Sequence, residues 1–183
     1  LCTGIYRSAS GGALWSKFRG IPSSSRRTRA FLQDPERPDT LYAGTTEGLW
    51  ATDDGGSSWS LRTSNKLVVN AVVPLPGGAL LLGTDGAGVL RSEGRGASFA
   101  DSNSGFSARL VAHVLRDPER QRLIAAVRND RFHSGVLVAP RPEGPWTRLA
   151  ASSSAMNRSM MPSSTIAGVT RHRLAQRASR DSP

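Results

Sequence analysis

The sequence predicts an all-β protein built from β-propeller blades, each a sheet of four antiparallel strands. The first observation is a fixed spacing, in which a glycine precedes an aromatic residue by eleven positions four times over. The pairs are Gly4 and Trp15, Gly48 and Trp59, Gly88 and Phe99, and Gly135 and Trp146. The second observation is the outer period, because these glycines lie 44, 40 and 47 residues apart. Four strands repeated at this period are typical of propeller blades joined by loops of changing length.

Each unit reads as two short apolar segments with a turn between them, followed by the glycine and a further strand pair. In the second unit the expected strands are about 28–33, 40–45, 48–53 and 58–63. Proline and glycine mark the turn after the first segment, in DPERP at 34–38, LPGG at 75–78 and DPERQ at 117–121. Alternation within the strands is imperfect, which favours a sheet covered on both faces.

The repeats occupy residues 1–150, and the count of blades is about three and a half. A partial blade at 1–20 begins at its third strand, and whole blades follow at about 28–63, 67–101 and 110–149. Residues 151–183 form a Ser/Arg-rich tail that offers little for a core, so we expect it to be poorly ordered. We therefore expect an open or partial propeller, and a fragment or truncated reading frame rather than a closed four-bladed ring.

The stretch Thr52–Trp59, TDDGGSSW, carries the most specific motif in the chain. It resembles the Asp-box, or BNR repeat, whose pattern is Ser/Thr-x-Asp-x-Gly-x-Ser/Thr-Trp. Asp-boxes occur on the propellers of sialidases, xyloglucan-degrading glycosidases, sortilin-type receptors and photosystem II assembly factors. The resemblance implies a structural turn away from the ligand-binding face, and it favours a secreted or periplasmic location. The residues assigned to this structural role are Ser8, Gly12, Trp15, Thr52, Asp54, Gly56, Ser58, Trp59, Ser92, Gly96, Phe99 and Trp146.

The chemistry of the motif supports a turn. The carboxylate of Asp54 can accept hydrogen bonds from nearby amides, and Gly56 allows a backbone conformation that other residues resist. The aromatic residue that closes each box is expected to be mostly buried, one per blade, since its ring folds down as local core. The other copies have decayed, with Ser10, Gly94 and Arg141 at the acid position. Such decay is harmless if the box only folds a turn.

Composition excludes several classes of site. Cys2 is the only cysteine, which excludes an intrachain disulfide and a paired-cysteine metal site, and His113, His133 and His172 lack ligand spacing. We therefore expect no metal and no cofactor. The net charge is +10, but the arginines are spread along the chain, so nucleic-acid binding is not favoured. No apolar run approaches the roughly 18–20 residues of a membrane span.

Catalytic signatures are weak. FRGIP at 18–22 is close to the sialidase Phe/Tyr-Arg-Ile-Pro motif, but it has an inserted glycine and follows an Asp-box instead of preceding one. Neither Tyr6 nor Tyr42 has a glutamate placed to activate it. A carboxylate pair from distant blades stays open, with Asp85 and Asp130 as candidates.

The sequence thus favours a non-catalytic scaffold that binds a protein or glycan partner with the loops of one face. The candidate ligand-face residues come from equivalent loops of three blades and are Glu47, Asp85, Asn129, Asp130, Arg131 and His133. The insertion 128–134 is the longest of these loops. The alternative is a fragment of a glycoside hydrolase, of sialidase or xyloglucanase type, whose catalytic residues lie partly outside this chain.

Overall fold

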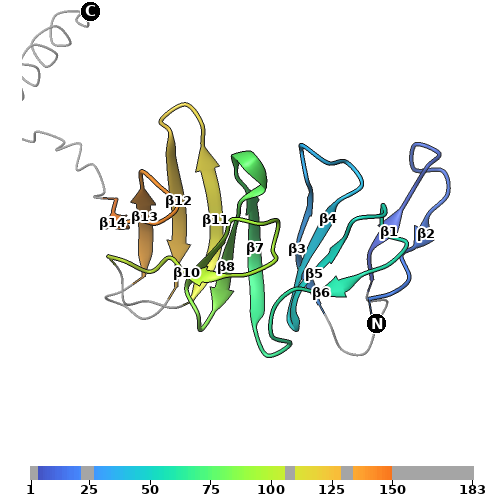
Figure 1. Ribbon diagram of the computed structural model, residues 1–183, viewed down its shortest axis with the longest axis horizontal. Helices are drawn as coiled ribbons and strands as arrows, with labels where there is room; N and C mark the ends of the chain where they lie inside the picture. Colours follow the sequence, from blue (N-terminus) through green and yellow to red (C-terminus); the bar gives the residue numbers. More distant parts are fainter. Residues whose placement is uncertain (1–3, 22–26, 106–109, 129–133, 150–183) are drawn as a thin grey trace, which may run out of the picture. The chain divides into compact units, whose positions relative to one another are not determined.

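The computed structural model describes residues 4–21, 27–105, 110–128 and 134–149. The chain divides into two units, Leu1–Leu149 and Ala150–Pro183, and all described residues belong to the first. The predictions made for the tail at 151–183 and for the residues Asn129, Asp130, Arg131 and His133 lie outside the described residues. Within the described part there are fourteen strands and one short 3-10 helix (Figure 1).

The strands form one two-stranded and three four-stranded antiparallel sheets, here called blades 1 to 4. Blade 1 contains β1 (Tyr6–Arg7) and β2 (Ser16–Lys17). Blade 2 contains β3 (Thr28–Gln33), β4 (Leu41–Thr45), β5 (Gly48–Thr52) and β6 (Ser60–Leu61). Blade 3 contains β7 (Val68–Pro74), η1 (Pro76–Gly78), β8 (Leu80–Asp85), β9 (Val89–Ser92) and β10 (Ala100–Asp101). Blade 4 contains β11 (Val111–Asp117), β12 (Arg122–Val127), β13 (Gly135–Ala139) and β14 (Thr147–Arg148).

The prediction of an all-β chain with four-stranded blades is confirmed. In each whole blade the strands pair in chain order, and the first three strands of blade 2 match the predicted spans closely. The fourth strand is shorter than expected, only Ser60–Leu61 in blade 2. It ends early because the chain must turn towards the next blade, although the Arg62 amide still donates to the Leu49 carbonyl at 2.8 Å.

The core lies between neighbouring blades, so the middle strands of blades 2 and 3 are covered on both faces. One cluster joins Tyr42 and Leu49 of blade 2 to Leu80 and Leu82 of blade 3. A second cluster joins blade 3 to blade 4, including Trp146. Every residue of β4 and β5 is buried as a result, which accounts for the poor alternation of their sequences.

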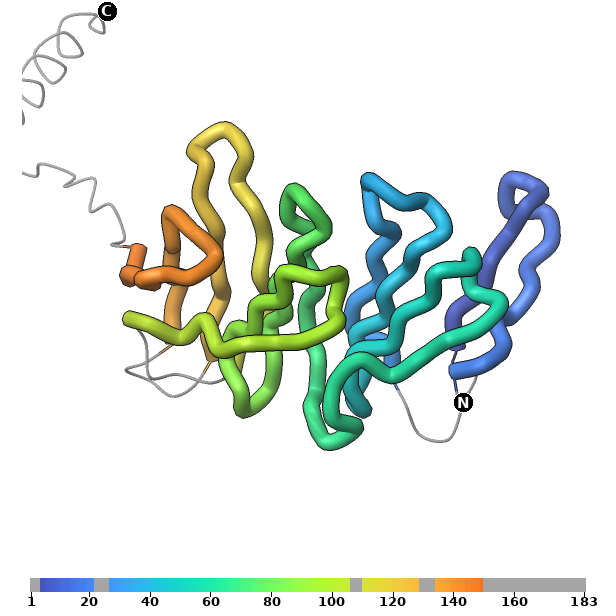
Figure 2. The backbone as a smooth tube through the Cα atoms, in the orientation of Figure 1, coloured from blue at the N-terminus to red at the C-terminus, as the bar shows by residue number. Residues whose placement is uncertain are grey.

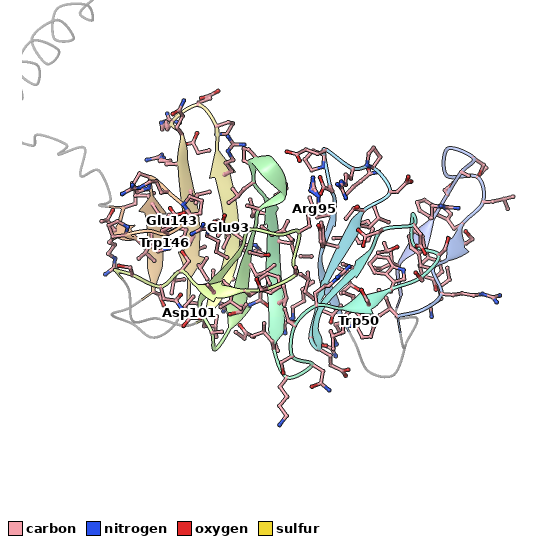
Figure 3. All side chains as sticks on the ribbon, viewed as in Figure 1. Trp50, Glu93, Arg95, Asp101, Glu143 and Trp146 are labelled. Carbon is pink, nitrogen blue, oxygen red and sulfur yellow. The ribbon has the colours of Figure 1, made fainter. Side chains whose placement is uncertain are left out.

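Ion pairs reinforce the contacts between neighbouring blades. Arg95 of blade 3 pairs with Glu36 of blade 2 at 2.9 Å, and Arg91 of blade 3 pairs with Glu143 of blade 4 at 2.8 Å. Glu93 also pairs with Arg91. Figure 3 labels Arg95, Glu93 and Glu143 in these positions.

The loops divide between two ends of the blades. The β3–β4 turn and the β5–β6 loop meet at one end, here called the turn end, where the Gly55 amide donates to the Asp39 carbonyl at 2.9 Å. The opposite end, here called the rim end, holds the start of the inner strands β3, β7 and β11. There the Thr46 amide of the β4–β5 turn donates to the Arg27 carbonyl at 3.0 Å. The tube in Figure 2 shows the hairpin turns of β3–β4 and β11–β12 together at the upper side of the view.

Candidate functional site

A β-bulge marks the same place at the start of each inner strand. The register of β3 on β4 shifts between Thr28 and Ala30, and the other two inner strands shift in the same way. The bulged residues are therefore Arg29 in β3, Asn70 in β7 and Ala112 in β11. Bulges redirect side chains and are common beside active and binding sites. Three equivalent bulges at the rim end thus point to a shared feature of this surface.

The bulged side chains connect one blade to the next. The Arg29 guanidinium donates to the Asn70 side-chain oxygen and lies 3.4 Å from the Asp85 carboxylate. The Asn70 side-chain nitrogen donates to Asp85 at 2.8 Å and to the Val111 carbonyl of blade 4 at 2.9 Å. Ala112 has no polar group to extend the series, so the chain of bulge contacts stops at blade 4.

A cavity of about 540 Å³ lies where this series stops. The residues that line it are Arg29, Asn70, Asp85, Leu110, Ala112, His113 and Arg128. Among the described lining residues, the cationic groups come from Arg29 and Arg128, and Asp85 is the only carboxylate. His113 and Arg128 are exposed, and neither side chain has a polar partner within the described part of the chain. The cavity therefore offers uncommitted hydrogen-bond donors beside an acid that is already bonded.

Two of the residues predicted for the ligand face, Glu47 and Asp85, lie in the described part of the chain. Asp85 lines the cavity, as the last residue of β8. Glu47 lies in the β4–β5 turn at the same rim end, where its amide donates to the Thr45 hydroxyl at 3.1 Å, but it does not line the cavity.

Sequence reasoning missed Arg29, Asn70 and His113, and it included Arg128 only as the first residue of the 128–134 insertion. Alignment of the strand starts TRAFL, VNAVV and VAHVL would have placed Arg29, Asn70 and Ala112 in one column. A polar residue in that column, inside an otherwise apolar strand, is the signal that was available.

The Thr52–Trp59 loop joins β5 to β6 at the turn end. Asp54 accepts hydrogen bonds from the Ser58 hydroxyl at 2.6 Å, the Ser58 amide at 2.9 Å and the Thr52 hydroxyl at 2.6 Å. These bonds, that of the Ser58 hydroxyl above all, hold the pKa of Asp54 well below its usual range. The acid acts on its own loop, at the opposite end of the blade from the Asp85 cavity.

Two further contacts fix the same loop. The Gly56 amide donates to the Thr52 hydroxyl at 3.0 Å. Gly56 has φ +92°, and a Cβ at this position would collide with the ring of Phe18 in blade 1. Phe18 also meets Trp59 edge to face, with ring centroids 5.9 Å apart. Phe18, the start of FRGIP, therefore packs between blades 1 and 2 and does not face the rim-end cavity.

The equivalent loops keep the same bonds where their residues allow it. Ser8 and Ser92 stand in the place of Thr52 and accept from the amides of Gly12, at 2.8 Å, and Gly96, at 3.0 Å. Ser10 stands in the place of Asp54, and its hydroxyl accepts from the Leu14 amide at 2.8 Å. A serine thus reproduces one of the bonds of the carboxylate.

The expectation that the four aromatic residues occupy equivalent, mostly buried places is wrong for Trp15. Trp146 is 1% exposed, Trp59 and Phe99 are half-buried, and Trp15 is 64% exposed. The cause is directional: each of these rings faces the preceding blade, as Phe99 does in the core with blade 2 and Trp146 in the core with blade 3. Blade 1 has no preceding blade among the described residues, so Trp15 is left uncovered.

Two other kinds of feature are absent from the described ranges. No group of three or more His, Cys, Asp or Glu residues there could hold a metal ion. None of the helices formed by those residues is long and apolar enough to cross a membrane.

Comparison with known proteins shows the fold. No protein-family model and no curated protein matches this sequence. An ancestral GH74 enzyme matches the structure with a TM-score of 0.64 at 21% identity, over 83% of this chain and 22% of that enzyme. The GH74 xyloglucanase from Xanthomonas campestris matches with a TM-score of 0.59 at 17% identity, over 81% and 27%. YCF48 bound to D1 peptide matches with a TM-score of 0.55 at 17% identity, over 75% and 45%.

This chain therefore spans less than half of each of these proteins. At such low identities the matches show the fold alone. The chain has a partial β-propeller fold of the kind found in GH74 enzymes and in YCF48.

Proposed function

We propose that this chain is a non-catalytic Asp-box β-propeller scaffold that binds a protein or glycan partner at its rim end. The observation that carries the proposal is the cavity at the last bulge, where Arg128 and His113 lie beside Arg29 and have no polar partner among the described residues. Guanidinium groups form strong, charge-assisted bonds with carboxylates. The group recognised is therefore a carboxylate, from an acidic side chain or from an acidic sugar.

The same geometry argues against hydrolysis. Glycoside hydrolases use two carboxyl groups roughly 5–10 Å apart. Asp85 is the only acid among the described residues that line the cavity, and its oxygens already accept from Asn70 and meet Arg29. Asp54 acts at the turn end, within its own loop. This position of Asp54 supports a structural role for the Asp-box at Thr52–Trp59.

The compared structures support both kinds of partner. YCF48 has been solved with a D1 peptide, and one GH74 protein is a xyloglucanase. These properties belong to those proteins. For this chain they favour either a peptide or a glycan as the occupant.

Binding can be measured with four labelled probes: hexaglutamate, hexalysine, an oligogalacturonate and a neutral xyloglucan oligosaccharide. We expect the two acidic probes to bind. Added salt should weaken their binding, since it screens exposed charges. Arg128→Ala is expected to weaken binding about 10-fold, the value of one charge-assisted bond. Arg37→Ala, which removes an arginine at the turn end, is the matched control and is expected to change nothing.

The proposal would be contradicted if hexalysine bound more tightly than hexaglutamate. It would also be contradicted if Arg128→Ala and Arg37→Ala changed the affinity for hexaglutamate equally. Fluorogenic sialosides and xyloglucan oligosaccharides test the glycoside hydrolase alternative directly. We expect no turnover. Turnover that disappears in Asp85→Asn would replace the binding role with a catalytic one.

A further inference from the structure

The blades of this chain meet through one repeated interface. Each sheet has a forward face, which packs against the next blade, and a backward face, which packs against the preceding one. On the forward face of blade 3, Val73, Leu81 and Val89 form one apolar row under blade 4. Val73 is 7% exposed, and the other two residues are 0% exposed.

Blade 4 carries a third copy of this forward row without a cover among the described residues. The strand register places Leu115, Ile124 and Val136 at the positions of Val73, Leu81 and Val89. In blade 2 the same positions hold Leu32, Tyr42 and Leu49, which pack in the core with blade 3. In blade 4, however, Leu115 is 49% exposed and Val136 is 40% exposed.

Blade 1 carries the complementary half of the interface. Leu90 and Phe99 lie on the backward face of blade 3 and pack in the core with blade 2. The eleven-residue repeat places Tyr6 and Trp15 at these two positions in blade 1. Tyr6 is 43% exposed and Trp15 is 64% exposed. One chain therefore exposes both partners of a contact that it buries twice between its own blades.

We propose that two copies of this chain associate head to tail, with the forward face of blade 4 in one copy covering the backward face of blade 1 in the other. The contact continues the interface that joins blades 2, 3 and 4. Exposed aromatic anchors such as Trp15 dominate interfaces of this kind, and clustered apolar exposure marks a binding surface. Because the two faces differ, the contact is heterologous and leaves one face of each kind open for a further copy or for ring closure.

The inference does not depend on the proposed ligand, because it concerns blade faces and not the rim-end cavity. Analytical ultracentrifugation of the full chain over a range of concentrations tests it. The wild-type mass is expected to rise with concentration. Trp15→Asp and Leu115→Asp each remove one face at an exposed position, so each variant is expected to stay monomeric with an unchanged circular dichroism spectrum. Ser98→Asp, in an exposed loop, is the control and should assemble like the wild type.

Mixing the two variants gives the sharper result. Trp15→Asp keeps its blade 4 face and Leu115→Asp keeps its blade 1 face, so the mixture is expected to form a dimer and nothing larger. If either aspartate alters the spectrum, the milder pair Trp15→Ser and Leu115→Thr is used in the same way. A wild-type chain that stays monomeric at every concentration, variants that assemble like the wild type, or a mixture that stays monomeric would each overturn the proposal.

Discussion

The tryptophans of the repeat provide a matched series for testing how the blades hold together. Trp15, Trp59 and Trp146 occupy the same position of the repeat, but they range from 64% exposed through half-buried to 1% exposed. Replacement of each by alanine removes the same atoms. The loss of stability is therefore expected to follow the cover that the preceding blade supplies.

The expected magnitudes follow from burial. A fully buried tryptophan covers roughly 200 Å², and at about 25 cal/mol per Å² its loss costs about 3–5 kcal/mol. Trp146→Ala should show this value, and it also loses the bond from Nε1 to the Ser102 carbonyl at 2.8 Å. Trp59→Ala should cost less than Trp146→Ala, and Trp15→Ala should lie within about 0.5 kcal/mol of zero.

Urea unfolding followed by circular dichroism measures these differences without relying on tryptophan emission. The midpoint should fall in the order Trp146, Trp59, Trp15, with an unchanged slope for each variant. Equal losses for all three, or the largest loss at Trp15, would refute the reasoning that each ring is buried by the preceding blade.

Three further predictions concern the turn end. The pKa of Asp54 lies below its ordinary value of 3.8, so the contribution of Asp54 to stability is complete above about pH 4 and is lost as the pH falls further. In Asp54→Asn the urea midpoint should therefore depend less on pH over this range. Gly56→Ala should destabilise by more than about 1 kcal/mol, because φ is +92° and the new Cβ meets Phe18, whereas Gly55→Ala meets only Asp39 at 3.7 Å and should cost less; equal urea midpoints would contradict this. Burial, with Asp34 as a second cause, raises the pKa of Tyr42 to about 12. The stabilising contribution of the neutral Tyr42 is therefore complete below pH 10 and is lost as the pH rises towards 12. Ultraviolet titration at the tyrosinate band should show Tyr42 ionising at a higher pH than an ordinary tyrosine.

The repeat made the fold predictable, because a fixed spacing from Gly48 to Trp59 reports a local unit that recurs whatever lies around it. The strand order and the Asp54 loop follow from that unit alone. The burial of Trp15 could not be predicted in this way, since it depends on the neighbouring blade. The motif depends on residues close together in the sequence, whereas the burial of its tryptophan depends on contacts with another blade.

The candidate site was predicted less well, for a related reason. Asp85 was identified from its place in the repeat, but its partners Arg29 and Asn70 come from other strands through bulges. A bulge shifts the side-chain alternation by one residue, and a strand pattern read at period two does not show it. The cavity itself depends on Ala112 being too small to extend the series, which is visible only when the three blades are aligned.

The central claim is that a partner binds at the rim end. The most direct measurement fills the cavity there and compares the affinity for hexaglutamate with that of a matched variant at the turn end. Ala112→Trp places a large side chain in the cavity, and Ser57→Trp places the same side chain on the exposed β5–β6 loop. The account predicts that Ala112→Trp abolishes binding while Ser57→Trp leaves it unchanged. Binding that survives Ala112→Trp and is lost in Ser57→Trp would contradict it.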